Sequence, residues 1–217
     1  MNAPQIDALQ RYHDLPATPW RNGRGTTREI ARAAIDAPEA AGELFAWRIS
    51  MAEISEPAPF SVFRSVDRLL GTLQGQINLI VEDIEVRLNP GDEPVVFRGD
   101  VPASAAVAGQ SRTAVDLNLM VTDTLGWGSM SVLQPGILRV PTPPTVTSPR
   151  GRVLAEVHQF VIASNEVTAY LPGDQRLSLR PGDVLPVRSG DGVALAAVGV
   201  AGYLVMAGRF DLPAVAA

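Results

Sequence analysis

The segment Thr18–Arg32 (TPWRNGRGTTREIAR) concentrates side chains that can recognise a small anion. It holds Trp20, Asn22 and four arginines, and Arg28 lies in its strand-like part TTREI. Glycines next to Asn22 predict a tight turn that delivers polar side chains to a fixed place. Because an arginine fork pairs with a carboxylate or a phosphate through two hydrogen bonds, the available chemistry is anion recognition. The alternative is a solvated first strand with surface salt bridges.

A second polar set follows in Trp47–Glu53 (WRISMAE), which alternates with the period of a β-strand. Arg48 and Ser50 share one face, and Trp47 lies on the other. If the first face looks into a small barrel, Arg48 is a charge in a pocket that needs an anionic partner or ligand. In the alternative, Arg48 points to solvent while Trp47 fills the core.

Two more segments have the same character. In DLNLM, Asp116 and Asn118 share a face; Asp116 suits the neutralisation of an arginine, and Asn118 suits a hydrogen bond to a ligand. The run Phe60–Phe63 (FSVF), followed by Asp67 and Arg68, indicates an aromatic lid that ends in a charged pair. A surface turn held by an Asp–Arg bridge is the alternative.

Composition excludes several kinds of chemistry. The 217 residues include no cysteine and no lysine, so thiolate nucleophiles, disulfides, Schiff bases and the P-loop lysine are absent. With only His13 and His158, a three-histidine metal site is impossible within one chain, and we expect neither metal nor cofactor. A net charge of −5 argues against nucleic acid as a partner. Since no apolar run resembles a signal peptide or a membrane span, we expect a cytoplasmic protein without a membrane partner.

The elements that must position these residues are short strands bounded by Gly, Pro, Asp or Asn, which favours an all-β sandwich or barrel. Short helical turns are expected in Pro4–Tyr12, Ala33–Ala41 and Pro59–Ser65, and the end after Pro213 is expected to fray. The predicted strands are Leu69–Leu73, Ile77–Val81, Glu85–Leu88, Val95–Arg98, Val115–Val121, Val157–Ile162, Ala169–Leu171, Val193–Ala197 and Gly202–Ala207.

An internal repeat divides the chain. Leu88–Asp100 (LNPGDEPVVFRGD) and Leu179–Asp191 (LRPGDVLPVRSGD) share Leu, Pro-Gly-Asp, a central valine and a closing Gly-Asp, which predicts strand, tight turn, strand in each. We therefore expect a first barrel over residues 1–139, a proline-rich link over 140–149 and a second barrel over 150–217. Strands from the first part are expected to complete the second barrel, within one compact unit.

The ordered motifs PWRNGRGTTREI, WRIS, PFSVF, DRLL and DLNLM resemble the HutD/Ves family over roughly the first half of the chain. The resemblance implies a bicupin, with two double-stranded β-helix (jelly-roll) barrels and few short helices, and loss of the usual cupin metal site. It also implies a protein associated with histidine utilisation that senses a pathway intermediate. A small acidic metabolite such as formylglutamate or urocanate fits that implication.

Two positions depart from the family pattern. Arg24 stands where the family turn NGGG has glycine, so Arg24 either carries strain at a positive φ or reaches the pocket. Arg64 and Ser65 stand where the family tends to have Pro-Gly.

The leading hypothesis is a metal-free small-molecule binding protein that modulates histidine catabolism. Its predicted ligand-binding residues, with Arg48 as the main carboxylate partner, are Trp20, Asn22, Arg28, Arg48, Ser50, Phe60, Ser61, Arg68 and Asn118. The rival is a metal-independent isomerase or hydrolase that uses Glu29 or Asp116 as general base. A protein-interaction module with a filled barrel is a third option, and exposed strand edges make a homodimer plausible.

Overall fold

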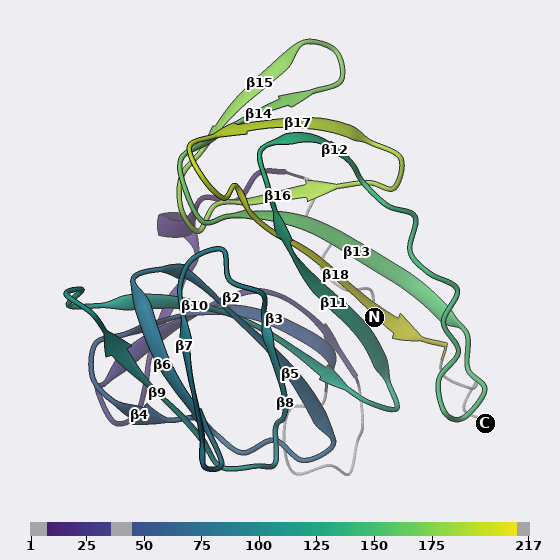
Figure 1. Ribbon diagram of the computed structural model, residues 1–217. Helices are drawn as coiled ribbons and strands as arrows, with labels where there is room; N and C mark the ends of the chain where they lie inside the picture. Colours follow the sequence, from purple (N-terminus) through teal and green to yellow (C-terminus); the bar gives the residue numbers. More distant parts are fainter. Residues whose placement is uncertain (1–7, 36–44, 212–217) are drawn as a thin grey trace.

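Two successive sets of eight strands, paired in the same order, make up the fold. The computed structural model describes residues 8–35 and 45–211, and Figure 1 shows one barrel stacked on the other. The first barrel consists of β3 (Phe45–Ile54), β4 (Ala58–Pro59), β5 (Val66–Gln74), β6 (Gln76–Val81), β7 (Ile84–Leu88), β8 (Val95–Arg98), β9 (Ala103–Ala108) and β10 (Ala114–Thr122). The second consists of β11 (Gly126–Leu133), β12 (Gly136–Arg139), β13 (Leu154–Ala163), β14 (Val167–Leu171), β15 (Gln175–Leu179), β16 (Val184–Val187), β17 (Gly192–Ala197) and β18 (Gly202–Phe210).

Each barrel is a jelly roll of two antiparallel four-stranded sheets. The first pairs its strands in the orders β3-β10-β5-β8 and β4-β9-β6-β7. The second uses β11-β18-β13-β16 and β12-β17-β14-β15, which is the same order with every strand number raised by eight. Two further strands, β1 (Ala17–Pro19) and β2 (Gly25–Ala34), extend the first sheet beside β3. The all-β prediction and the two jelly rolls are thereby confirmed.

Every predicted strand lies within or coincides with an observed one, whereas the helical expectations largely fail. In the described parts of the chain the single helical element is a 3-10 turn, Tyr12–Asp14. Pro59 ends β4, and the residues after it form a loop; Ala33 and Ala34 end β2. The remainder of those expectations, at 4–7 and 36–41, and the end after Pro213 lie outside the described residues.

Strands that lie before the expected boundary at residue 139 take part in the second barrel. Strand β11 pairs with β18, and β12 pairs with β17, so both belong to the second barrel. The barrels therefore meet at the turn 123–125, and the proline-rich segment 140–149 connects β12 to β13 inside the second barrel. Prolines at that place prevent a strand without marking a domain border.

The largest apolar cluster lies between the barrels. Strands β3 and β10 send Trp47 and Leu119 toward the second barrel, whose β13 and β18 contribute Phe160 and Tyr203. The Tyr203 hydroxyl reaches across to donate a hydrogen bond to the Asp92 carbonyl at 3.0 Å. The interior of the second barrel is a separate, aliphatic cluster. Burial of these apolar surfaces holds the two barrels as one body.

The two repeated Pro-Gly-Asp turns have the same local geometry. In both, the aspartate carboxylate accepts the backbone N–H three residues earlier, at 2.7 Å for Asp92 and 2.9 Å for Asp183. Gly91 and Gly182 have φ of 92° and 86°, a region that favours glycine. A Cβ on Gly182 would lie 2.6 Å from the Tyr12 ring, so this turn also requires glycine for close approach.

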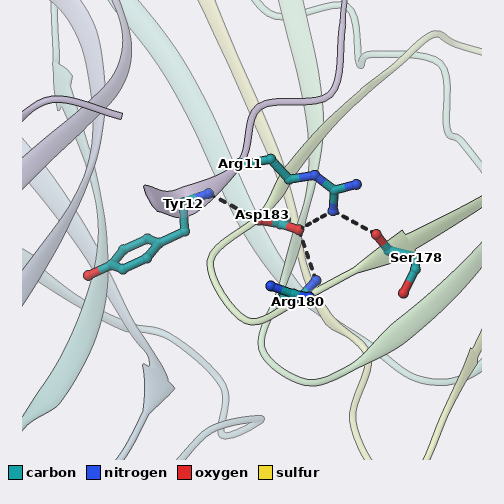
Figure 2. A network of polar contacts seen from close by, with 5 residues as sticks. All are labelled: Arg11, Tyr12, Ser178, Arg180 and Asp183. Carbon is teal, nitrogen blue, oxygen red and sulfur yellow. Dashed lines mark hydrogen bonds and ion pairs between the residues drawn. The ribbon is translucent and has the colours of Figure 1, made fainter. Parts of the chain in front are cut away.

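Residues 10–15, here the N-terminal strap, attach the beginning of the chain to the second barrel. Figure 2 shows Asp183 receiving Arg11 Nη1 on Oδ2 at 2.6 Å and the Tyr12 N–H on Oδ1 at 3.0 Å. Arg11 also donates to the Ser178 carbonyl at 2.7 Å. The carboxylate of Asp183, which is buried, therefore closes its own turn and also fixes the strap that leads into β1.

Replacing Asp183 by alanine should lower the free energy of unfolding by about 2–4 kcal/mol, since it leaves two backbone N–H groups without their acceptor and Arg11 without its carboxylate partner. The matched control is Asp191→Ala, whose carboxylate accepts, from the described residues, the Arg188 N–H alone, at 2.8 Å. Asp191→Ala should cost about 1 kcal/mol. Urea unfolding of the three proteins measures both values, and equal losses would contradict the role given to the strap.

The two positions at which the sequence departs from the family pattern, Arg24 and Ser65, differ in their backbone conformation. Ser65 has φ 58°, whereas Arg24 has no positive φ, and its Nη1 donates to the Pro57 carbonyl at 2.9 Å. Arg24 therefore carries no such strain and points away from the first barrel's interior. Serine in the left-handed region is strained by about 1 kcal/mol relative to glycine.

Ser65→Gly should consequently raise the melting temperature by about 2–4 °C, the shift expected for about 1 kcal/mol in a chain of this size. Ser111→Gly is the control, because Ser111 is also exposed in a loop but has no positive φ. A rise of the same size for both variants would show that relief of strain at Ser65 is not the cause.

Candidate functional site

A cavity of about 480 Å³ lies in the first barrel, beneath the turn that joins β1 to β2. Strands β3, β5 and β10 supply its polar wall, and the segment after β4 supplies aromatic side chains. Eight of the nine predicted ligand-binding residues line it: Trp20, Asn22, Arg48, Ser50, Phe60, Ser61, Arg68 and Asn118. That these residues bind a ligand stays a prediction.

Strand register sets the arrangement of the polar wall. Met120 of β10 pairs with Arg48 of β3 on one side and with Arg68 of β5 on the other. Neighbouring strands lie about 4.8 Å apart, so the two arginines start about 10 Å from each other and face the same interior. Asn118 and Asp116 follow on the same face of β10, toward the apolar cluster that contains Ala114.

Arg68 is a buried cation without an acceptor. Its side chain is 3% exposed, and its guanidinium carbon lies 4.3 Å from the Phe60 ring centre and 5.2 Å from that of Phe97. Within residues 8–35 and 45–211, its Nε has no hydrogen-bond partner and the guanidinium has no ion pair within 4.0 Å. Burial lowers the pKa of Arg68 to about 10, although Asp116 opposes this, so the group remains charged at neutral pH.

Arg48 stands at a more open place and is held by a carboxylate. Its Nε donates to Glu29 Oε2 at 2.7 Å, and the other Glu29 oxygen lies 3.4 Å from Arg32 Nε. Glu29 is thus shared between two cations. The contact through Nε fixes the direction of the Arg48 fork along the cavity wall.

Asp116 and Asn118 place two hydrogen-bond acceptors inside the barrel. Asp116 is fully buried, and its Oδ1 accepts the Ala52 N–H at 3.0 Å, while its Oδ2 has no donor among the described residues. Burial raises the pKa of Asp116 to about 7, against the opposing effects of Arg68 and the Ala52 hydrogen bond. Asn118 is 7% exposed, and its Oδ1 also lacks a donor.

The β1–β2 turn is fixed by its own hydrogen bonds. Trp20 donates from its indole nitrogen to Thr27 Oγ1 at 2.8 Å. Asn22 accepts the Arg24 N–H at 3.0 Å, which closes an Asx turn. These bonds hold Trp20 as a wall of the cavity, where its ring packs near the first barrel's core.

Arg28 is the predicted residue that the structure places elsewhere. It pairs with Met51, on the face of β3 that packs toward the second barrel. Its Nη1 donates to the Leu15 carbonyl, and its guanidinium carbon lies 4.8 Å from the Tyr12 ring centre. Arg28 therefore supports the N-terminal strap, and the expectation that it assists at the ligand site is not supported.

Sequence reasoning missed several residues around the cavity. Phe97, which stacks against Arg68, lies on β8, outside the motifs singled out in the sequence. Its alternation with Val96 in VVFR was the available sign that its side chain faces the interior of the barrel. Thr27 lines the cavity, as does Phe63, which the predicted aromatic lid already contained. Thr27 precedes the mistaken Arg28 and faces the opposite way, as β-strand alternation requires.

The second barrel lacks this polar set. Matching the strands one to one puts apolar side chains at the equivalent register positions: Trp127, Val157, Leu204 and Met206 in place of Arg48, Arg68, Asp116 and Asn118. At these four positions the first barrel is therefore polar and the second is apolar.

Two features are absent from the described residues. They contain no cluster of three or more His, Cys, Asp or Glu side chains placed to hold a metal ion. None of their helices is long and apolar enough to cross a membrane.

Two tandem double-stranded β-helices, one of them hollow and lined with arginine, define a bicupin with a candidate anion site. The HutD family profile matches residues 12–201, and the chain belongs to this family. The resemblance noted in the sequence motifs is thereby confirmed.

Known relatives agree with that placement. HutD from Pseudomonas fluorescens SBW25 is 25% identical, with a TM-score of 0.66 over 93% of this chain and 98% of that one. An uncharacterized 21.2 kDa protein in the hutC 3' region of Pseudomonas putida is 33% identical over 46% of this chain and 52% of its own length. Protein Ves of Citrobacter koseri is 32% identical over 49% and 53%. The chain spans about half the length of the curated relatives it matches.

The buried Asp116 makes a prediction about pH. Because its pKa is raised in the folded state, folding binds a proton at this site, and that contribution to stability is lost as pH rises from about 4 through about 7. The charged groups that face it are Arg68 from β5 and, through Arg68, Arg48 from β3. Wild-type protein should therefore lose stability relative to Asp116→Asn between pH 5 and pH 8.

Melting temperatures of both proteins across this range test the point. A difference between wild type and variant that stays constant with pH would show that Asp116 does not take up a proton on folding.

Proposed function

We propose that the protein binds a small carboxylate metabolite in the first-barrel cavity and thereby senses or modulates histidine catabolism. The observation that carries the proposal is Arg68, a guanidinium 3% exposed between two phenylalanine rings with no acceptor among the described residues. A buried guanidinium without a hydrogen-bond acceptor is costly, and a bound carboxylate supplies negative charge together with two acceptor oxygens.

The rest of the cavity is consistent with a small ligand. Its volume of about 480 Å³ is in the range of metabolite pockets. Arg48, oriented by Glu29, gives a second donor fork, while Trp20 and Phe60 provide apolar walls. Ser50, Ser61 and Asn118 are the groups available to orient the ligand by hydrogen bonds.

The connection with histidine catabolism is supported by family and relatives. The P. putida relative is described by its position in the hutC 3' region, and the HutD structure from P. fluorescens was solved in a formate condition. Formate is the smallest carboxylate. Formylglutamate and urocanate, the small acids that the family resemblance implies, are the first candidates for the ligand.

A metal-independent isomerase or hydrolase is the second candidate, favoured by one observation. Asp116 combines a pKa near 7 with a free oxygen inside the cavity, which are the properties of a general base or acid at neutral pH. Glu29 is less suited because it is shared by Arg48 and Arg32.

A thermal-shift series tests the binding proposal with histidine, urocanate, formiminoglutamate, formylglutamate and glutamate at millimolar concentration. At a ligand concentration of about 100 times Kd, stabilisation of about 2.7 kcal/mol corresponds to a rise of at least about 5 °C for an acidic intermediate. Arg68→Met and Arg48→Ala should each abolish that rise. Arg68→Met keeps an apolar side chain between the two rings and should not destabilise the free protein.

Arg28→Met is the matched control, because Arg28 lies outside the cavity and its loss should leave the ligand response unchanged. A rise that survives Arg68→Met would overturn the proposed site. Proton NMR of the same mixtures over several hours separates the two candidate functions, since a binding protein leaves the compound intact and an enzyme converts it.

A further inference from the structure

The cavity contains unsatisfied acceptors as well as unsatisfied donors. Asp116 Oδ2 and Asn118 Oδ1 are both buried, both belong to residues that line the cavity, and neither receives a hydrogen bond within the described residues. Native proteins satisfy nearly all buried polar groups, so each such oxygen calls for a donor. Asn118 can reverse its amide to suit a partner, whereas an ionised Asp116 can only accept.

A simple carboxylate ligand does not answer this need. It brings further acceptor oxygens, which Arg48 and Arg68 can take, and its negative charge is repelled by Asp116. The other oxygen of Asp116 is already engaged with the Ala52 N–H at 3.0 Å, so the side chain cannot turn away without losing that bond. Oδ2 thus belongs to a residue that lines the cavity and has no hydrogen-bond partner among the described residues.

We infer that Asp116 is a specificity-determining residue, which selects ligands that carry an N–H or O–H donor in addition to a carboxylate. This inference rests on the proposed function and deepens it. The carboxylate binds at the level of Arg48 and Arg68, and the donor binds Asp116 Oδ2 farther along β10.

The strand register supports this division of the cavity. Both arginines are in register with Met120, whereas Asp116 is in register with Ala52, two pleats along the same face. Four residues of strand span about 13 Å, and Asn118 lies midway. The long arginine side chains shorten that gap, so a ligand of several bonds connects the two ends while a one-carbon acid does not.

The neighbouring barrel offers a comparison for the role of Asp116. Its equivalent in the filled second barrel is Leu204, which packs in the aliphatic interior. A leucine at this position serves the fold, so the jelly roll itself does not need the carboxylate. The fold therefore does not explain why a carboxylate stands at this position, where burial disfavours its charged form.

Two matched pairs of compounds test the inference on the wild-type protein at pH 8, where Asp116 is mostly ionised. N-acetylglycine and levulinate differ only in an N–H replaced by CH₂, as do N-acetyl-β-alanine and 5-oxohexanoate. Dissociation constants come from NMR titration of the ¹⁵N-labelled protein. In at least one pair the amide should bind about tenfold or more tightly, because a lost hydrogen bond to a buried charged acceptor has about that effect.

Asp116→Asn is the matched variant, since its Oδ1 still accepts the Ala52 N–H while an NH₂ donor replaces Oδ2. The preference for the amide should fall to about one-fold or reverse, whereas Arg68→Met should weaken both members of a pair. Equal affinity of the two compounds for wild type, with Arg68 still required, would overturn this inference and leave the proposed function intact. Absence of binding by all four compounds would count against the proposed function and against this inference with it.

Discussion

Three strands of the first barrel, β3, β5 and β10, have both faces buried, and the rest of the structure depends on their register. One face, with Trp47 and Leu119, packs against the second barrel; the other, with Arg48 and Asp116, lines the cavity. Because side chains alternate strictly along a strand, a shift by one residue would put arginines into the dry contact between the barrels. The apolar surface of the second barrel thus stabilises this register of β3, β5 and β10 and makes any other register unfavourable. In this way it fixes the direction of the cavity side chains without lining the cavity.

The strand pattern of this chain was predictable because its signals are local. Runs of Val, Ile and Leu bounded by Gly, Pro or Asp predicted the strands, and the repeated Pro-Gly-Asp turns predicted two similar units. Strands β11 and β12 lie before the expected boundary, yet they belong to the second barrel because they pair with β18 and β17, roughly 50 to 80 residues later. Pairing between distant segments leaves no signal in the local sequence. The prolines at 140–149 do give a local signal, which was interpreted as a link between the barrels.

The candidate site was predictable as a set of residue types and not as a geometry. Alternation placed Arg48 and Ser50 on one face, but it could not decide which face looks inward, since both are buried here. Arg28 was assigned to the site because it shares a segment with Trp20, although strand alternation turns it toward the strap. Phe97, which stacks against Arg68 from β8, is brought there by the barrel closure alone.

The unequal filling of the two barrels has a consequence for stoichiometry and dose response. A repeated fold suggests two equivalent interiors, yet among the described residues the arginine-lined cavity lies in the first barrel, whereas the interior of the second is packed with aliphatic side chains. Cooperativity within a chain requires at least two coupled sites. If the proposed metabolite binds in that one cavity, a monomer should follow a simple hyperbola, going from one-tenth to nine-tenths occupancy over roughly two decades of concentration.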